Sequence, residues 1–225
     1  MRLLARLFLI VLGASLSAAP TPPELAAALK TFRADGTKGW AFTQSTTAGD
    51  RSRVEHYDPL GRDFQLWTLV RQDGRPPTAD ETRKYNELKM RRSSNENAPN
   101  VKDQIVPDSC EVLEASAERG VYRFHLKPGD DDDRSAPFMR ATFSLHRPTA
   151  TIEKVELAST APFSPVFLVQ IQEARTVMTY SLPADGRPTL LREVSVKVRG
   201  RAMWFRSLDQ DMIVTYSDYV YAGKR

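Results

Sequence analysis

The chain has 225 residues, of which 41% are hydrophobic and 27% charged, and its formal net charge is +4. This length is enough for one domain with a sizeable core. So small a net positive charge does not indicate a nucleic-acid-binding protein. The single cysteine, Cys110, excludes an internal disulfide and with it the small disulfide-stabilised class.

Residues 1–19 predict a secretory signal peptide. Arg2 and Arg6 give a basic start, residues 7–12 form an apolar run too short to span a bilayer, and Ser17-Ala18-Ala19 supplies small residues for cleavage. An uncleaved anchor is the alternative, disfavoured because polar sequence follows at once and no second run is long enough to span. We therefore expect export to the periplasm, no transmembrane segment in the mature chain, a mature charge of +2, and one domain over residues 20–225.

The first segment after the signal peptide predicts a helix over Thr21–Ala34. Pro22-Pro23 suits its first turn. Leu25, Ala28, Leu29 and Phe32 fall on one face, which is typical of a helix that packs against a core.

A second helix is predicted over roughly Ala79–Arg92. Thr78 and Glu81 have the spacing of a capping box, in which each side chain bonds to the other residue's amide. Tyr85 and Leu88 are its main apolar positions. Its basic residues predict a solvated face, with a contact to anionic headgroups or an acidic partner as the alternative.

The rest of the chain has the pattern of β-strands separated by turns, as in a meander. Apolar and polar residues alternate from Met139 to His146, which marks one buried face. No alternating βαβ rhythm occurs, which disfavours a parallel sheet. The segments expected to be strands are 40–44, 53–57, 66–70, 121–126, 139–145, 152–158, 166–172, 176–182, 190–199, 202–209 and 212–219.

No pattern of catalytic or metal-binding residues is present. The sequence has no nucleophile elbow, phosphate loop, dinucleotide fingerprint or zinc-protease helix. His125 and His146 are expected at opposite ends of a hairpin, too far apart to share a metal. Residues 130–133 are four aspartates, for which a solvated hairpin tip is favoured over a calcium loop. We therefore expect no enzyme, no cofactor and no metal site.

The large apolar side chains on the predicted strands have two interpretations. They fill an ordinary core, or they line a concave sheet whose inner face is only partly filled, leaving a pocket for an apolar ligand. In the second interpretation the first helix is a lid over the pocket. The residues expected to line it are Phe32, Phe143, Phe167, Val169, Val196 and Trp204.

Several short motifs carry a resemblance to known proteins. They are Tyr57-Asp58-Pro59, Trp67-Thr68-Leu69, residues 73–78, Glu81, Tyr85, Phe163-Ser164-Pro165, Gly200-Arg201-Ala202 and Ser217-Asp218-Tyr219. In these the chain resembles a group of secreted proteobacterial proteins that are similar in architecture to the outer-membrane lipoprotein carrier family, LolA and LolB. That family has an unclosed antiparallel barrel with helices over its mouth, and it holds lipoprotein acyl chains. The chain lacks the N-terminal lipidation cysteine of the membrane-anchored branch, and no lipid-contacting residue is carried over.

Pattern and resemblance together predict a mainly β (α+β) fold. We expect a strongly curved antiparallel sheet, an unclosed β-barrel of about ten strands, with about two covering helices. The resemblance implies a periplasmic, non-enzymatic binding or carrier protein for a lipid, a lipidated protein or another apolar ligand. The alternative is an envelope module that binds a protein partner and has a filled core and no small ligand.

Overall fold

The computed structural model describes residues 20–34, 38–62, 65–92, 101–129, 134–203 and 205–223. The expected signal peptide, the four aspartates 130–133 and Trp204 lie outside these ranges.

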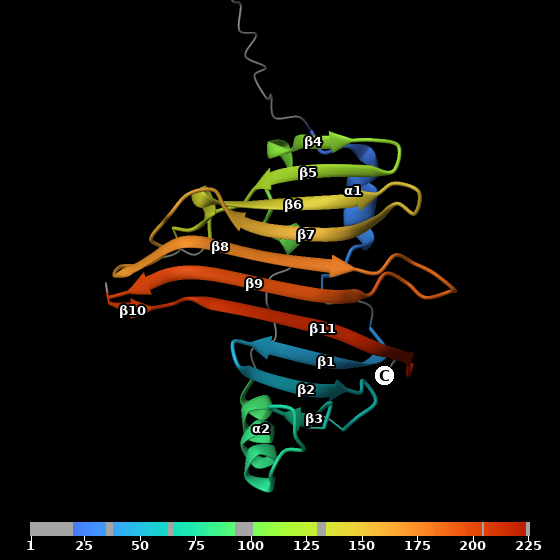
Figure 1. Ribbon diagram of the computed structural model, residues 1–225. Helices are drawn as coiled ribbons and strands as arrows, with labels where there is room; N and C mark the ends of the chain where they lie inside the picture. The colour runs from blue at the N-terminus through green and yellow to red at the C-terminus, as the bar shows by residue number, and fades with distance from the viewer. Residues whose placement is uncertain are drawn as a thin grey trace, which may run out of the picture.

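The described strands form one antiparallel sheet of eleven strands (Figure 1). Their order is β3-β2-β1-β11-β9-β8-β7-β6-β5-β4, with β10 paired to β9. Since β3 and β4 are the two ends of this order, the sheet is unclosed, as predicted. The strands are β1 Trp40–Ala48, β2 Arg51–Tyr57, β3 Trp67–Gln72, β4 Glu111–Ala115, β5 Arg119–His125, β6 Met139–His146, β7 Thr151–Ser159, β8 Val169–Tyr180, β9 Leu191–Ala202, β10 Arg206–Ser207 and β11 Gln210–Tyr221.

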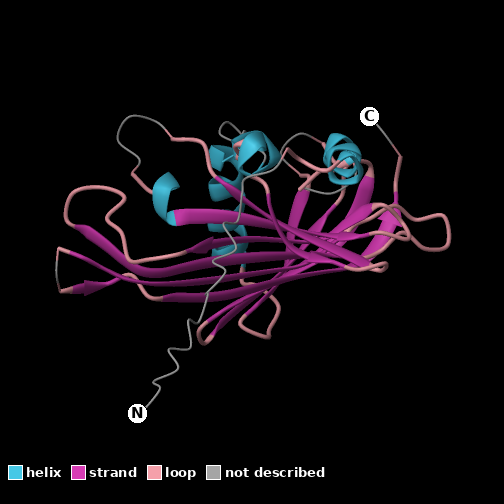
Figure 2. Ribbon diagram, turned by 90° about the horizontal axis from the view of Figure 1, so that it is seen from above, coloured by secondary structure: helices cyan, strands magenta, loops and turns pink. Residues whose placement is uncertain are grey.

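The two longer helices lie on the same side of the sheet (Figure 2). Helix α1 spans Pro23–Thr31 and contacts β7, whereas α2 spans Ala79–Arg92 and contacts β3. The short helix α3 covers Val101–Gln104, and two 3-10 turns, η1 and η2, cover Pro107–Ser109 and Ala136–Phe138. We call the helix-bearing side of the sheet the inner face and the opposite side the outer face.

The similar segments around residues 73 and 185 form the same tight turn. Asp73 and Gly74 have φ of 51° and 79°, and Asp185 and Gly186 have φ of 52° and 73°. In each turn the flanking residues exchange backbone hydrogen bonds. Two central residues in the left-handed region match a type I′ hairpin turn, which favours aspartate followed by glycine.

The start of α2 is the predicted capping box. The Thr78 amide donates to Glu81 Oε2 at 2.7 Å, and the Glu81 amide donates to Thr78 Oγ1 at 3.3 Å. The Arg75 guanidinium also donates to both Glu81 carboxylate oxygens, at 2.9 and 2.7 Å. Of the two main apolar positions of this helix, Tyr85 is buried and Leu88 is 53% exposed.

The main core lies between α1 and strands β5 to β9. Leu25, Phe124 and Phe143 have no exposed surface. The Phe32 and Phe143 rings meet edge to face with centroids 6.4 Å apart, an arrangement that aromatic rings favour. Cys110 is fully buried in this core, and burial raises the pKa of its thiol, as expected for an inert cysteine.

Two strand predictions at the C-terminal end were wrong. Segments 166–172 and 176–182 were expected to be separate strands, but β8 runs continuously over Val169–Tyr180 with an irregularity between Ile171 and Glu173. A bulge interrupts the sequence pattern without ending the strand. Segment 202–209 was expected to be one strand, yet only Arg206–Ser207 is a strand. Met203, with φ of 48°, breaks the extended backbone there.

Candidate ligand-binding face

Apolar side chains line the inner face of the central strands β8, β9 and β11. In the pairing register Met178, Val194 and Val214 lie side by side, and so do Thr176, Val196 and Met212. Directly opposite residues in antiparallel strands share a face. Because Met178 and Val194 pack against the main core, both rows belong to the inner face.

This apolar face is only partly filled. Val196, Val198 and Met212 are half-buried, whereas residues of the same kind under α1, such as Val155, are fully buried. Helices α1 and α2 lie towards the two ends of the sheet and leave the central strands between them (Figure 1). The face therefore presents apolar surface that a ligand can cover.

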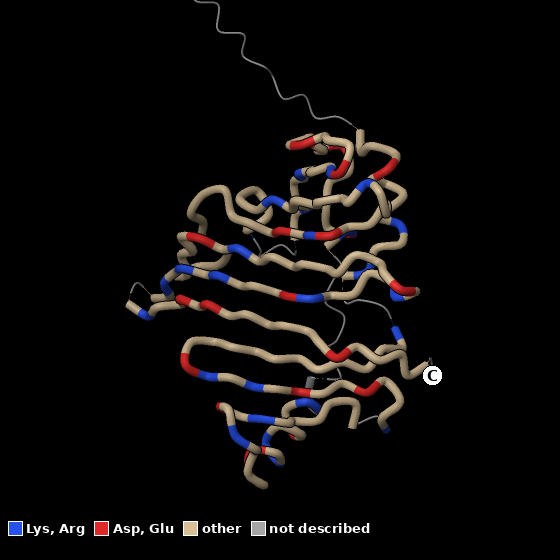
Figure 3. Tube along the Cα trace, turned by 45° about the vertical axis from the view of Figure 1, so that its right-hand side comes forward, with Lys and Arg blue, Asp and Glu red and all other residues tan. Residues whose placement is uncertain are grey.

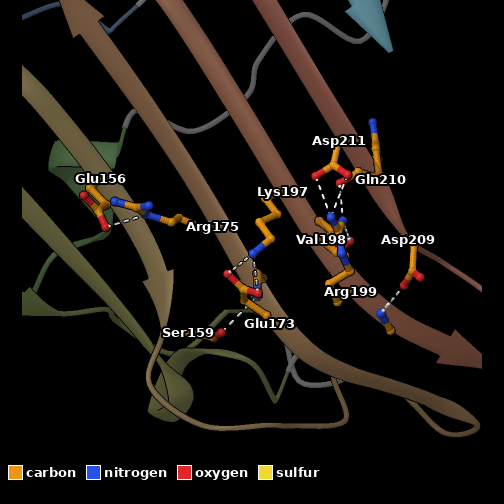
Figure 4. A network of polar contacts seen from close by, with 12 residues as sticks. Glu156, Ser159, Glu173, Arg175, Lys197, Val198, Arg199, Asp209, Gln210 and Asp211 are labelled. Atoms are coloured by element: carbon orange, nitrogen blue, oxygen red, sulfur yellow. Dashed lines mark hydrogen bonds and ion pairs between the residues drawn. The ribbon is translucent and has the colours of Figure 1, made fainter. Parts of the chain in front are cut away.

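The outer face of the same strands is charged, and its charges are paired. Arg175 Nε lies 2.9 Å from Glu156 Oε1, and Lys197 Nζ lies 2.8 Å from Glu173 Oε2 (Figure 4). The Arg175 guanidinium lowers the pKa of the Glu156 carboxyl. Positive and negative residues are interspersed along these strands (Figure 3). The contrast between the faces is that of a sheet with one solvated and one apolar side.

One end of the inner face is closed by α1, which is anchored as part of the core. Lys102 Nζ donates to the carbonyl oxygens of Phe32 and Leu29 at 2.8 and 3.2 Å, and the Tyr180 hydroxyl donates to the Ala34 carbonyl at 3.2 Å. These contacts tie the C-terminal end of α1 to α3 and β8. They favour a fixed helix over the movable lid expected from the sequence.

The N-terminal turn of α1 is held by a second group of polar contacts. The Tyr122 hydroxyl donates to Glu24, and Arg147 Nη2 lies 2.8 Å from Glu24 Oε1. These two partners, the tyrosine first, lower the pKa of the Glu24 carboxyl. Glu24 thus joins the helix to β5 and to the end of β6.

The other end of the inner face carries a buried carboxylate. Glu55 on β2 is 3% exposed; its Oε1 accepts from the Tyr85 hydroxyl at 2.8 Å and lies 2.9 Å from Lys89 Nζ. Its Oε2 accepts from Gln44 Nε2 at 3.2 Å. Burial, together with the Glu55 charge, raises the pKa of the Tyr85 hydroxyl.

Aromatic rings surround this carboxylate. Lys89 Nζ lies 3.9 Å from the centroid of the Trp67 ring, a cation–π contact. Phe42 packs against Tyr57, Trp67, Tyr216 and Tyr219, with centroid separations of 5.0 to 5.6 Å. This arrangement attaches the largely polar helix α2 to the sheet through two of its residues, Tyr85 and Lys89.

The residues that the sequence suggested as pocket-lining do not all meet. Phe143 and Phe32 touch each other inside the filled core. Val196 lies on the half-buried inner face, and Val169 is half-buried at the start of β8. Phe167 lies in the loop before β8 and is 89% exposed. Trp204 is outside the described residues.

Sequence reasoning missed the residues that form the polar end of the face. Tyr85 was expected as an apolar helix position, and nothing in its separation from Glu55 along the chain predicts that the two side chains meet. A signal for the apolar rows was available. Val194, Val196 and Val198 alternate with the polar residues Ser195 and Lys197 on β9.

A cavity of about 370 Å³ lies at another edge of the molecule, beside the end of β5 and η2. The residues lining it are His125, Leu126, Pro128, Arg134, Ala136, Pro137 and Phe138. As predicted, His125 and His146 lie at opposite ends of the β5–β6 ladder, where they pair with Arg140 and Arg119.

Within the described ranges no group of three or more His, Cys, Asp or Glu side chains is placed to hold a metal ion. Among the helices that the structure describes, none has the length and apolarity needed to cross a membrane.

Comparison with known proteins gives neighbours in fold. No family model matches the chain. No curated protein matches it either. A solved structure described as an outer membrane lipoprotein-sorting protein domain from Vibrio parahaemolyticus aligns with 88% of this chain and 91% of its own, at 9% identity and a TM-score of 0.36. A DUF1329 family protein from Desulfovibrio piger aligns with 90% of this chain and 93% of its own, at 12% identity and a TM-score of 0.36. The description of the first neighbour agrees with the resemblance noted in the sequence, and at these identities the likeness concerns the fold alone.

Proposed function

We propose that this protein binds and carries an apolar ligand, a lipid or the acyl chain of a lipidated protein, in the periplasm and without catalysing a reaction. The ligand lies on the inner face of β8, β9 and β11, between α1 and α2. Residues 20–225 act as one domain, and residues 1–19 direct export.

One observation carries this proposal. On the inner face Val196 and its β11 neighbour Met212 lie side by side and are half-buried, whereas Val214 in the neighbouring row is already buried. Exposed apolar surface is unfavourable in water, and covering it contributes about 25 cal/mol for each Å². An acyl chain is the simplest partner for a long apolar strip that crosses several strands.

The proposed binding is tested with a thermal shift. Long-chain fatty acid or lysophospholipid should raise the melting temperature, since a ligand at a hundredfold excess over its Kd adds about 3 kcal/mol to the folded state. Val196→Asp should remove the shift by placing a charge on the apolar strip. Ile213→Asp is the matched control, because Ile213 lies on β11, pairs with Ser195 and is 48% exposed on the outer face.

The outcomes separate binding from folding. If both variants keep the wild-type melting temperature and only Val196→Asp loses the shift, the inner face is the binding site. A wild-type protein that responds to no lipid in the panel and shows no saturable uptake of an apolar fluorescent probe contradicts the proposal.

The location is tested separately. N-terminal sequencing of the exported protein should begin at Ala19 or Pro20, within a residue or two. Recovery of an intact Met1 from the soluble envelope fraction would contradict cleavage.

A second candidate is an envelope assembly module that binds a protein partner and no small ligand. The filled core favours it, because Phe32 and Phe143, expected to line a pocket, pack against each other instead. A thermal shift that no lipid produces, together with specific capture of one envelope protein, would select this function.

A further inference from the structure

Two loops at one end of the sheet bring together large apolar side chains that are exposed to solvent. We call this the apolar tip and define it by the loop before β8 and the turn after β9, at the left in Figure 1. Phe167 is 89% exposed and Phe205 is 81% exposed. The remaining members are Val166, Leu168 and Met203, which are 40% to 56% exposed.

The backbone holds the two parts of the tip together. The Met203 amide donates to the Leu168 carbonyl at 2.8 Å. Both residues have positive φ, 48° and 64°, a region that bulky side chains adopt rarely and at a cost in free energy. The backbone of the tip is therefore a defined structure that places the two loops beside one another.

Two basic residues accompany the tip in the sequence. Across residues 160–170 and 200–207 the charged residues are Arg201 and Arg206, and Asp209 follows, whose Oδ1 accepts from the Gly200 amide at 3.1 Å. In the part of the chain that the structure describes, no ion pair involves either guanidinium. The amide of Arg134 donates to the Pro165 carbonyl, but four aspartates precede Arg134 in the sequence, so this segment adds no net positive charge.

The two arginines lie on opposite sides of the tip. Arg206 pairs with Ala202, and Ser207 pairs with Arg201, in the short β9–β10 ladder. Paired residues share a face and successive residues alternate, so the Arg201 and Arg206 side chains project from opposite faces of the sheet. Positive charge therefore flanks the apolar tip on both sides.

We propose that the apolar tip docks this protein onto a lipid bilayer with anionic headgroups. Aromatic and aliphatic side chains enter the interface between headgroups and acyl chains, as amphipathic membrane-binding segments do. Arg201 and Arg206 remain at the headgroup level, because long basic side chains keep their charge in water while an apolar surface inserts. A bilayer fits a projecting tip of this kind, and its anionic charge complements the two free arginines.

The experiment is co-sedimentation of the mature protein with vesicles of zwitterionic phospholipid containing about one-third anionic phospholipid. We expect saturable binding at low salt that weakens at high salt. The double variant Phe167→Ser/Phe205→Ser should bind at least about tenfold more weakly. The control is Val220→Ser, an exposed apolar residue (62%) near the C-terminal end of β11, which should bind like the wild type.

A second variant tests the charges. Arg201→Gln/Arg206→Gln should weaken binding about fivefold for each arginine and reduce its dependence on salt. If the phenylalanine variant fails to fold, the arginine variant still tests whether the tip binds vesicles. Val196→Asp should bind vesicles like the wild type. Loss of ligand binding on the inner face can therefore be distinguished from loss of vesicle binding at the tip.

Three outcomes overturn the proposal. The first is wild-type protein that stays in the supernatant with anionic vesicles. The second is a phenylalanine variant that sediments with the vesicles as the wild type does. The third is self-association in analytical ultracentrifugation that Phe167→Ser/Phe205→Ser abolishes, which would assign the tip to a second copy of the chain.

Discussion

The Lys89 ammonium lies 2.9 Å from the Oε1 atom of the Glu55 carboxylate, beneath helix α2. The carboxylate belongs to β2 and is 3% exposed, whereas the ammonium comes from a helix on which Arg83, Lys84 and Glu87 are exposed. Tyr85 donates to the same oxygen. Attachment of α2 therefore depends on a buried carboxylate whose oxygens are all satisfied.

Glu55→Ala should destabilise the protein by about 2–4 kcal/mol, because it leaves Lys89 and the Tyr85 hydroxyl without their shared acceptor. Asp80→Ala on the same helix is the control. It breaks ion pairs with Arg83 and Lys84 that are largely exposed, and should cost no more than about 1 kcal/mol. Denaturant titration measures both, and equal losses would show that Glu55 contributes no more than a surface residue.

The capping box makes a prediction about pH. Arg75, first, and the Thr78 amide hold the pKa of the Glu81 carboxyl at about 2, below its ordinary 4.5. Because the folded-state pKa is lowered, the stabilisation from Glu81 is complete above pH 4.5 and is lost as pH falls towards 2. Arg75→Gln should raise the pKa towards 4.5, as measured by NMR titration.

Arg83→Gln is the control for that titration, because Arg83 pairs with Asp80 and not with Glu81. It should leave the Glu81 titration unchanged. A wild-type Glu81 that titrates near its ordinary value would contradict the observed cap geometry.

Trp67 is half-buried in the aromatic cluster with Phe42 and Tyr57. We therefore expect Trp67→Ala to cost about 2–3 kcal/mol, less than a fully buried tryptophan. Thr78→Ala should cost about 1 kcal/mol through the lost cap. Chemical denaturation distinguishes the two values, and identical midpoints would remove Trp67 from the packed cluster.

Phe143 and Phe167 were predicted to share a ligand pocket, and the structure assigns them opposite environments. Phe143→Ala should cost about 3–5 kcal/mol because the ring is fully buried. Phe167→Ala should change the stability by no more than about 0.5 kcal/mol because the ring is 89% exposed. A large loss of stability in Phe167→Ala would mean that the loop packs against the body of the protein in solution.

Local signals in the sequence predicted much of the fold. The Thr78–Glu81 spacing predicted the start of α2, and the apolar–polar alternation from Met139 to His146 predicted β6. Both features depend on residues a few positions apart, so they can be predicted from local sequence alone.

Other features depend on contacts across the sheet and were not predictable. The bulge between Ile171 and Glu173 resembles a strand end in the sequence, because it shifts the alternation of apolar residues. The pairing of Glu55 with Lys89 requires β2 to lie beneath α2, which no local pattern indicates. Residue type alone could not show that Phe143 is buried and Phe167 exposed, because the burial of a side chain depends on its position in the fold.

The most direct test of the proposed function is native mass spectrometry of the mature protein purified from its own periplasm. The proposed carrier function predicts that an apolar small molecule co-purifies with the wild type and with Ile213→Asp, and is absent from Val196→Asp. Wild-type protein that carries no small molecule, or a bound species that Val196→Asp retains in full, would contradict a ligand site on the inner face of β8, β9 and β11.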